Sequence, residues 1–340
     1  METPVGPVPR VGTRLTRADR LGAVKVRWDL GRMHYRVDPG LYAVGDPVES
    51  SPVLVTANYK LSFDRLRRVL PGRNAWILVL DTRGINVWCA AGKGTFGTRE
   101  LVERIASSGL DRVVSHREVI LPQLAAPGVA AHQVRRLSGF RVVYGPIRAE
   151  DLPSFLDAGL KASPGMRRKG FPLGERAVLI PVELVAAMKW TLAALPLVFV
   201  LGGLGGGEGF LANALDHGIF AVIALLGAVL AGAVVTPLLL PWLPGRAFSL
   251  KGMVMGLVYA GALFLLRAGD LGKGAALVET AAWGLIAVAV AAYLAMNFTG
   301  ASTYTSLSGV SKEMRWAVPL EIGAGCVGLC LWIGSRFLSI

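Results

Sequence analysis

The chain has 340 residues, of which 53% are hydrophobic and 17% are charged; its mean hydropathy is +0.51 and its formal net charge is +13. Because soluble globular proteins carry about 25% charged residues, this composition excludes a disordered chain, a collagen and a disulfide-rich secreted scaffold. Residues 1–176 hold 28 Lys/Arg against 16 Asp/Glu, whereas residues 177–340 hold 8 against 7. We therefore expect a basic, water-facing half followed by a half that lies in lipid. Anionic lipid accounts for the basic charge, so no nucleic acid partner is expected.

The first half alternates short apolar strands with amphipathic helices. Residues 1–50 are rich in turn-forming residues and are expected to form an irregular lead-in. Strands are predicted at 53–57, 75–81, 85–89, 112–116 and 140–145. Helices are predicted at 61–70, 98–109, 127–139 and 149–159. This order predicts an α/β, Rossmann-like domain over residues 51–165 with a mostly parallel sheet, in which ligands bind at the carboxyl ends of the strands.

The second half contains five apolar segments, each close to the roughly 20 residues that a membrane-spanning helix needs. The predicted spans are 184–205, 217–241, 250–267, 275–297 and 317–335. Because an open strand cannot satisfy its backbone groups in lipid, all five are expected to be helices. We therefore expect an all-α, five-helix transmembrane domain over 184–340, joined to the first domain by a basic juxtamembrane linker at 166–183.

Positive charges predict the orientation in the membrane. Arg167, Arg168 and Lys169 precede the first span, and the loops on that same side carry Arg246, Lys251, Lys312 and Arg315. The loop after the third span weakens the pattern with Arg267 and Lys273. We expect a multi-pass protein of the inner (cytoplasmic) membrane, with the first domain in the cytoplasm and the C-terminus outside.

Some polar groups fall in or near the spans. The ionisable ones are Glu183, Lys189, Glu279 and Glu321. Such groups are functional candidates at membrane depth, but all four lie near predicted span ends, so snorkelling to the interface is the expected role. Cys326 and Cys330 share a helix face near Gly323 and Gly325, which predicts close helix packing, with a relay for a soft metal as the alternative.

The segment 81–98, DTRGINVWCAAGKGTFGT, follows a buried strand and precedes a helix, which is where ligands bind in this class of sheet. A phosphate-binding loop of the form G-x-x-x-x-G-K-[ST] is excluded, because Val87 and Gly94 stand where that loop needs Gly and Ser or Thr. A dinucleotide site is excluded as well. Gly92, Gly94 and Gly97 have the required spacing, but they arrive after a Cys-bearing turn and not directly after the strand.

Cys89 is the single cysteine of the first half. The small residues that follow it allow a flat, bulky partner to approach the backbone closely. Taken without other information, these residues leave open a buried structural cysteine, a nucleophile with His116 as its base, and a cysteine that lies against such a partner.

Residues 86–93, Asn-Val-Trp-Cys-Ala-Ala-Gly-Lys, resemble the signature N-[VI]-W-C-A-[AG]-G-K of the HgcA family, the corrinoid proteins of mercury methylation, at every position. The resemblance extends through 94–98, 119–146 and 297–314, and it covers the layout of a cytoplasmic corrinoid domain followed by five membrane helices. The first domain is also similar to the corrinoid iron–sulfur methyl carrier of acetyl-CoA synthesis.

The resemblance implies a bound corrinoid, cobalamin or a related form, with the Cys89 thiolate as the lower axial ligand of its cobalt. The implied function is a membrane-bound methyltransferase that passes a methyl group from methyl-Co(III) corrinoid to inorganic Hg(II), giving methylmercury. The alternatives are a corrinoid methyl carrier of one-carbon metabolism without mercury activity, and a membrane transport protein with a regulatory domain. The residues expected around the ring are Asn86, Val87, Trp88, Ala90, Ala91, Gly92 and Lys93, with Thr56, Thr95, Gly128 and Tyr144 as further candidates.

A soft, strongly donating thiolate suits the transfer of a methyl carbanion equivalent to thiophilic Hg(II). The same donor makes cobalt harder to reduce, so a low-potential electron donor is expected. The partners that the resemblance implies are HgcB, a small ferredoxin-like protein with two [4Fe–4S] clusters, and a methyl donor of one-carbon metabolism. The polar loop 297–316 is expected to dock on the first domain or to receive HgcB through Thr303, Tyr304 and Thr305.

Overall fold

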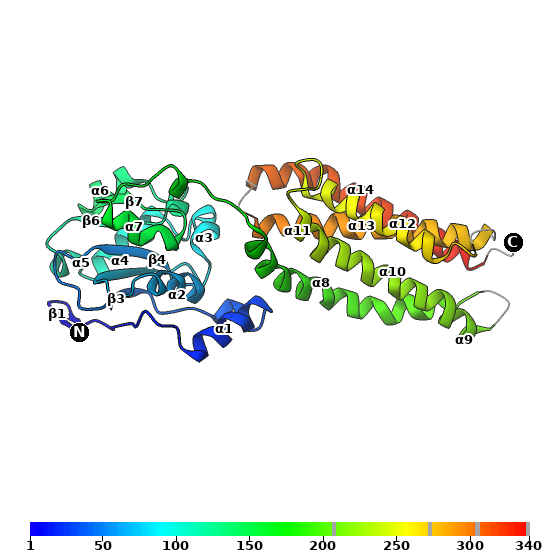
Figure 1. The fold of residues 1–340 in the computed structure, drawn as a ribbon, viewed down its shortest axis with the longest axis horizontal. Helices are drawn as coiled ribbons and strands as arrows, with labels where there is room; N and C mark the ends of the chain where they lie inside the picture. The colour runs from blue at the N-terminus through cyan, green and yellow to red at the C-terminus, as the bar shows by residue number, and fades with distance from the viewer. Residues whose placement is uncertain (206–208, 271–273, 303–306, 338–340) are drawn as a thin grey trace. The chain divides into compact units, whose positions relative to one another are not determined.

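The structure is a computed structural model that describes residues 1–205, 209–270, 274–302 and 307–337. The chain divides into two compact units (Figure 1). The first unit contains residues 1–26 and 30–170, and the second contains residues 27–29 and 171–340. The first is built on a β-sheet and the second on long helices.

A five-stranded sheet forms the centre of the first unit. Its strands lie in the order β3 (Gly40–Val44), β5 (Ala75–Leu80), β4 (Val53–Ala57), β6 (Glu118–Leu121) and β7 (Arg141–Tyr144). β3 runs antiparallel to β5 at the edge of the sheet, and the other four strands are parallel to one another. This arrangement confirms the predicted α/β, Rossmann-like fold with a mostly parallel sheet.

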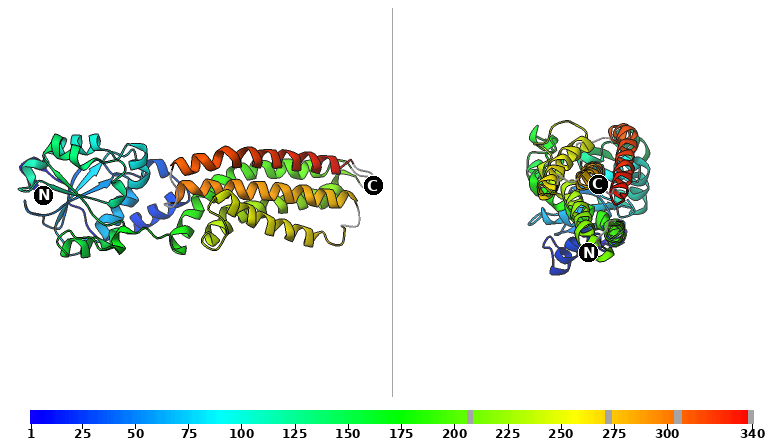
Figure 2. Two further views of the ribbon diagram at one scale, coloured as in Figure 1. Left: turned by 90° about the horizontal axis from the view of Figure 1, so that it is seen from above. Right: turned by 90° about the vertical axis from the view of Figure 1, so that its right-hand side faces the viewer.

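Helices cover both faces of this sheet, as Figure 2 shows from above. One apolar layer joins the sheet to α3 (Val87–Lys93), α4 (Thr98–Ser107) and α6 (Ala131–Ser138). The layer on the other face joins it to α2 (Lys60–Arg68) and α7 (Leu152–Asp157). β4 and β5 are buried on both faces, which explains why their sequences are continuous apolar runs.

Two predicted strands are wrong. Residues 85–89 enter the helix α3, because the Asn86 side chain caps its first turn. Residues 112 and 113 end the short helix α5 (Leu110–Val113), residues 114–116 belong to no helix or strand, and the strand that pairs with β4 is β6. Short apolar runs are compatible with either state, so tertiary contacts decide between them. Single 3₁₀ turns complete the unit at η1 (Arg32–His34), η2 (Gln123–Ala125), η3 (Ala149–Asp151) and η4 (Gly165–Arg167).

The first 50 residues are more regular than the expected lead-in. β1 (Glu2–Thr3) and β2 (Gly6–Pro7) form a small hairpin, and the helix α1 (Arg17–Arg27) follows. β3 then completes the sheet, with Leu41 opposite Leu78 of β5. An edge strand of this kind buries its apolar residues only through long-range pairing, which a local pattern does not reveal.

Among the described residues of the second unit, five helices are long and apolar enough to cross a membrane, as predicted. They cover α8 (Leu173–Gly202), Phe210–Leu239, α12 (Phe248–Leu266), Gly274–Gly300 and Ser308–Ser335. The second comprises α9 (Phe210–Asn213), α10 (Ile219–Leu230) and α11 (Thr236–Leu239), joined by π-helical turns at Ala214–Gly218 and Ala231–Val235. The last two contain α13 (Gly274–Asn297), η7 (Phe298–Ala301) and α14 (Leu307–Ser335). Because α8 begins at Leu173, most of the expected linker 166–183 is helical.

Small residues let these helices approach one another closely. A side chain at Gly232 or Gly252 would collide with the backbone of α13 at Ala291. In contrast, Cys326 and Cys330 are exposed on α14, so the packing role predicted for them is wrong within this chain. In the described part of the chain, no group of three or more His, Cys, Asp or Glu side chains is placed to hold a metal ion, and the alternative of a metal relay through the two cysteines stays a prediction.

Glu279 contradicts the snorkelling prediction, because its side chain is fully buried in the second unit. One carboxylate oxygen lies 2.7 Å from Nδ1 of His217, and the other accepts a hydrogen bond from Nε1 of Trp332 at 3.3 Å. The guanidinium groups of Arg267 and Arg336 lie 3.6 and 3.8 Å from the same carboxylate. Since a buried charge is costly without partners, this set of polar contacts is what allows Glu279 to be buried.

Replacement of this carboxylate tests its structural role. Glu279→Ala should lower the free energy of unfolding by about 3–5 kcal/mol, because two buried arginines lose the anion between them. Denaturant unfolding of the full chain in detergent micelles measures this loss. The control is Asp216→Ala, whose side chain is 58% exposed although it lies 2.8 Å from Arg267. Its loss should stay below about 1 kcal/mol, and equal losses would refute the importance of burial at Glu279.

Candidate functional site

The loop 81–86, between β5 and α3, is organised by one buried amide. Asn58 follows the neighbouring strand β4 and is 1% exposed. Its Oδ1 accepts hydrogen bonds from the backbone N–H groups of Thr82 and Gly84 at 3.1 and 2.9 Å. Its Nδ2 donates to the carboxylate of Asp81 at 3.0 Å. Because parallel strands end at the same edge of the sheet, a residue after β4 can thus shape the loop after β5.

Further contacts hold the loop in an unusual backbone path. Arg83 and Gly84 have φ angles of 57° and 73°, in the left-handed region that costs free energy for a residue with a side chain. The Thr82 hydroxyl lies 2.8 Å from Oδ1 of Asn58 and 2.7 Å from the carbonyl oxygen of Ile85. These hydrogen bonds hold the backbone on both sides of Arg83 and Gly84, so the loop leads directly into α3.

The helix α3 is short, and both of its ends are defined. Oδ1 of Asn86 accepts a hydrogen bond from the Cys89 backbone N–H at 2.9 Å, which satisfies one of the free donors of the first turn. Gly94 ends the helix with a φ of 80°, and the N–H of Phe96 then donates to the carbonyl of Ala90 at 3.1 Å. These contacts fix the direction in which Cys89 points.

The two faces of α3 have different environments. Ala90 and Ala91 are 0% and 4% exposed and pack in the core, so their side chains serve the fold. Trp88 and Cys89 are partly exposed, and Gly92 and Lys93 are exposed. Cys89 is a free thiol, and Lys93 lies one helical turn further along on the same side. Asn86 and Val87 are partly exposed at the start of the helix, where Asn86 acts as the cap and Val87 packs on the core.

The further candidates have structural partners of their own. Thr56 is 4% exposed within β4. The Thr95 hydroxyl is 3.5 Å from the Ala90 carbonyl. The Tyr144 hydroxyl donates to the carbonyl of Val129 at 2.5 Å, and burial raises the pKa of this hydroxyl, so it stays a donor at neutral pH. Whether any of these residues also contacts a ligand stays a prediction.

Gly128 contributes to the site as the residue that allows a close backbone approach. A Cβ atom at this position would collide with the carbonyl oxygen of Phe96 and would lie 2.9 Å from Cα of Ala91. The Gly128 carbonyl accepts a hydrogen bond from the N–H of Thr98 at 3.2 Å. The Thr98 hydroxyl in turn accepts from the N–H of Ala130 at 2.8 Å. Gly128 therefore ties the segment after α3 to the segment before α6.

His116 does not belong to this site. Its Nε2 donates to the carbonyl of Ser51 at 2.9 Å, and its Nδ1 accepts from the N–H of Glu118 at 3.2 Å. His116 precedes β6 and so lies at the amino edge of the sheet, whereas Cys89 follows a strand at the carboxyl edge. The hypothesis that Cys89 is a nucleophile with His116 as its base is therefore wrong.

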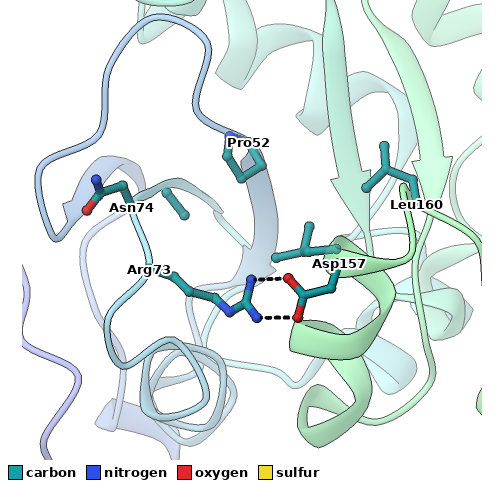
Figure 3. A pocket seen from close by; sticks show the side chains of 7 residues that line it. Pro52, Arg73, Asn74, Asp157 and Leu160 are labelled. Atoms are coloured by element: carbon teal, nitrogen blue, oxygen red, sulfur yellow. Dashed lines mark hydrogen bonds and ion pairs between the residues drawn. The ribbon is translucent and has the colours of Figure 1, made fainter.

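A shallow hollow also lies at the amino edge, at the start of β4 and β5 (Figure 3). Its lining residues are Pro52, Arg73, Asn74, Ala75, Leu156, Asp157 and Leu160. Arg73 and Asp157 pair across it with two hydrogen bonds of 2.8 and 2.6 Å. Arg73 and Asp157 therefore neutralise each other, and neither of the two is left unpaired to bind a ligand.

Asn58 and Thr82 are the residues that the sequence analysis missed. Both are polar and almost fully buried, at 1% and 0% exposure. The available signal was their position, since each comes one or two residues after a continuous apolar strand in an α/β pattern. The sequence places both at the edge where ligands bind, but it does not show that they bond to each other.

Comparisons with known proteins match the region that holds this site. Residues 30–156 match the family model described as the CO dehydrogenase/acetyl-CoA synthase delta subunit. The acetyl-CoA decarbonylase/synthase complex subunit gamma of Methanopyrus kandleri is 35% identical over 123 residues, which cover 36% of this chain and 26% of the relative. The same subunit is 34% identical over 123 residues in Methanothermobacter thermautotrophicus (36% of this chain, 26% of the relative) and 30% identical over 128 residues in Archaeoglobus fulgidus (37% and 27%).

The chain thus spans about a quarter of the length of these relatives. The matched residues include the sheet and α3, and they end before residue 171, where the main part of the second unit begins. The first unit is therefore similar to subunits of acetyl-CoA synthase and decarbonylase systems, and the helices of the second unit lie outside the matched region.

The amide that shapes the loop can be tested directly. Asn58→Ala should lower the free energy of unfolding by about 2–4 kcal/mol, because the N–H groups of Thr82 and Gly84 lose their acceptor in a buried place. Denaturant unfolding of the full chain measures the loss. The matched control is Asn74→Ala, an exposed amide that accepts one bond from the N–H of Asp46. A similar loss in both variants would contradict the role assigned to Asn58.

The close approach at Gly128 has its own test. Gly128→Ala should destabilise the first unit by about 1–3 kcal/mol, because the added methyl group overpacks the contact with α3. Gly92→Ala is the matched control, since its new Cβ would have nothing within 4 Å. That change sits inside a helix and should be neutral or stabilising by up to about 1 kcal/mol. Protease sensitivity of the segment 81–98 reports both effects, and equal sensitivity of the two variants would refute the packing argument.

Proposed function

We propose that this chain is a membrane-bound corrinoid protein that carries and transfers a methyl group, with Cys89 as the cobalt ligand. The observation that carries the proposal is a free, partly exposed thiol on the open face of a capped helix at the ligand-binding edge of the sheet. The likeness of residues 30–156 to acetyl-CoA synthase subunits supports it, since it agrees with the resemblance to the corrinoid methyl carrier of acetyl-CoA synthesis.

The residues on the open face of α3 fit such a group. A flat macrocycle needs an unobstructed approach, and at Gly92 there is open space where a side chain would lie. When bound, a corrinoid supplies a cobalt ion that holds the methyl group. The Cys89 thiolate is a soft donor suited to that metal. Lys93 contributes a cation on the same helix face, which suits the amide carbonyls or a phosphate of the ligand, and Trp88 contributes an apolar surface beside the thiol.

The role of the remaining residues is to position this donor. Asn86 holds the first turn of α3 through its bond to the Cys89 N–H, and Asn58 holds the loop before it. Ala90 and Ala91 anchor the helix in the core from the opposite face. A ligand atom that is fixed in this way loses little conformational freedom on binding, which favours a defined metal–sulfur contact.

For the acceptor of the methyl group we propose inorganic Hg(II), with methylmercury as product. The eight-residue match over 86–93 to the HgcA signature supports this choice, and so does the affinity of a soft donor system for a thiophilic metal. The expected partners are then HgcB and a methyl donor of one-carbon metabolism. The competing proposal is a carrier of one-carbon metabolism without mercury activity, which the similarity to acetyl-CoA synthase subunits favours. Thr303, Tyr304 and Thr305, expected to form a docking site, lie outside the described residues.

For the location we propose the inner membrane, with the first unit in the cytoplasm and the C-terminus outside. The basic residues 167–169 before α8 support this orientation. The exception noted in the sequence, Arg267, is 8% exposed and pairs with Asp216 and Glu279, so it is not a free charge at the membrane surface. Lys273 lies outside the described residues.

The thiol is the point at which the proposal is tested. Cys89→Ala should abolish the thiolate–cobalt absorption of the purified, corrinoid-loaded chain and reduce methyl transfer to background. Cys89→His should keep a ligand but a harder one, and transfer should fall steeply. Cys326→Ala is the control, because that cysteine is exposed on α14 in the second unit, and it should leave spectrum and transfer unchanged. Full transfer by Cys89→Ala would overturn the assignment.

The acceptor is tested by a separate assay. In a single turnover, the methyl-loaded chain mixed with Hg(II) should yield one methylmercury for each methyl group lost from the corrinoid, and continued turnover should require both HgcB as reductant and a methyl donor. A chain that shows the absorption of a thiolate-bound corrinoid but forms no methylmercury would support the carrier of one-carbon metabolism. A colourless chain after reconstitution would refute both corrinoid functions.

A further inference from the structure

The outer face of α1 carries a row of exposed apolar side chains. Leu21 and Val24 are 62% and 51% exposed on the helix. Their spacing of three residues places them on one face. Leu30 and Met33 follow, with 63% and 66% of their surface exposed. Single apolar residues on a surface are ordinary, but four large apolar side chains between positions 21 and 33, each more than half exposed, indicate an interaction surface.

Basic side chains flank this row. Arg17, Arg20 and Lys25 are exposed on the same helix, and Arg32 is partly exposed. Long basic side chains of this kind lay their methylene groups along an apolar surface and hold their charges at its rim. We call the four apolar residues at positions 21, 24, 30 and 33 the outer stripe.

The opposite face of α1 is held against the rest of the first unit. The Asp19 carboxylate lies 2.5 Å from Nζ of Lys60 and 2.8 Å from Nη2 of Arg67. The Tyr35 hydroxyl donates to the backbone carbonyl of Asp19 at 3.2 Å, and its ring packs on Gly22. Burial alone would raise the pKa of Asp19, but bonds from Lys60, Thr16 and Arg67 outweigh it and hold the pKa well below its usual range.

These contacts set the direction in which the helix faces. The acidic residue of α1 is neutralised on the inner side, so the outward side presents only apolar and basic groups. Leu21 and Val24 of the outer stripe therefore lie on a helix whose opposite face is docked, and Leu30 and Met33 follow that helix in the chain. Within the described ranges, its residues remain exposed in the folded chain.

We propose that the outer stripe lies in the headgroup region of an anionic bilayer and holds the first unit at the membrane surface. Helices that lie in this interface combine an apolar face with Lys and Arg beside it, as α1 does. The five apolar helices of the second unit are long enough to span such a bilayer. The first of them begins at Leu173, three residues after Gly170 ends the first unit. An acidic protein surface would pair with the basic residues but would leave Leu21, Val24 and Leu30 in water.

The proposal does not depend on the corrinoid or on the methyl acceptor. It requires only that the second unit spans a membrane, because a chain anchored there keeps α1 at a high local concentration near the lipid. Anionic lipid attracts each basic residue near the surface, so removal of one should lower the ratio of surface-bound to free α1 by about fivefold.

The test uses the full chain in nanodiscs and a fluorescent probe that responds to its surroundings. Cys89, Cys326 and Cys330 are replaced by Ser, and Val24→Cys is labelled with an environment-sensitive fluorophore. In discs of phosphatidylcholine with phosphatidylglycerol, we expect a blue-shifted emission that a nitroxide-bearing lipid quenches. The shift should shrink in phosphatidylcholine alone, at high salt, and when Arg17, Arg20 and Lys25 are replaced by Gln.

Leu137→Cys is the matched control. Leu137 is an apolar residue of α6 with 60% of its surface exposed, and it lies in the first unit away from α1 in the sequence. Its label should show neither the shift nor the quenching. Emission from the Val24 label that equals that of the Leu137 label would overturn the proposal. A blue shift without quenching by the nitroxide lipid would also overturn it, because protein and not lipid would then cover the outer stripe.

Discussion

The buried amide of Asn58 is the contact on which the geometry of the candidate site depends. It stands after β4 and bonds to the loop after β5, so two neighbouring parallel strands are linked at their carboxyl ends by side-chain hydrogen bonds. The loop passes through two left-handed residues, a path that costs free energy and persists only where other contacts enforce it. Because this loop leads directly into α3, the amide decides where Cys89 lies.

The helix α3 is too short to be stable alone, since isolated helices of fewer than about 12 residues are marginal in water. Its stability comes from the cap at Asn86, the turn at Gly94 and the burial of Ala90 and Ala91. The absence of a side chain at Gly128 lets this buried face approach the next loop. Because one face of α3 packs against the core, the opposite face, which carries the Cys89 thiol, stays open.

The second unit solves a different problem, because its surface is apolar and its polar groups must be matched internally. Glu279 is buried with His217, Trp332 and two arginines around it. Helix contacts elsewhere rely on glycine and alanine, as at Gly232 and Gly252 against Ala291. Burial therefore changes which loop charges face the membrane surface. Arg267 is a loop charge by its place in the sequence, but in the structure it is buried and pairs with Glu279.

The sequence by itself determined the features that depend on composition and on long, regular patterns. These are the alternating strands and helices, the parallel strands β4 and β5 with their continuous apolar runs, and the five apolar helices. The eight-residue segment 86–93 also made Cys89 the candidate cobalt ligand, through its resemblance to the HgcA signature. Only the tertiary structure decided that residues 85–89 lead into a helix, that Glu279 is buried and that His116 lies at the other edge of the sheet from Cys89. The physical reason is that the conformation of a short segment and the burial of a polar side chain depend on hydrogen bonds and packing with residues far away in the chain, and these partners are not visible in a local pattern.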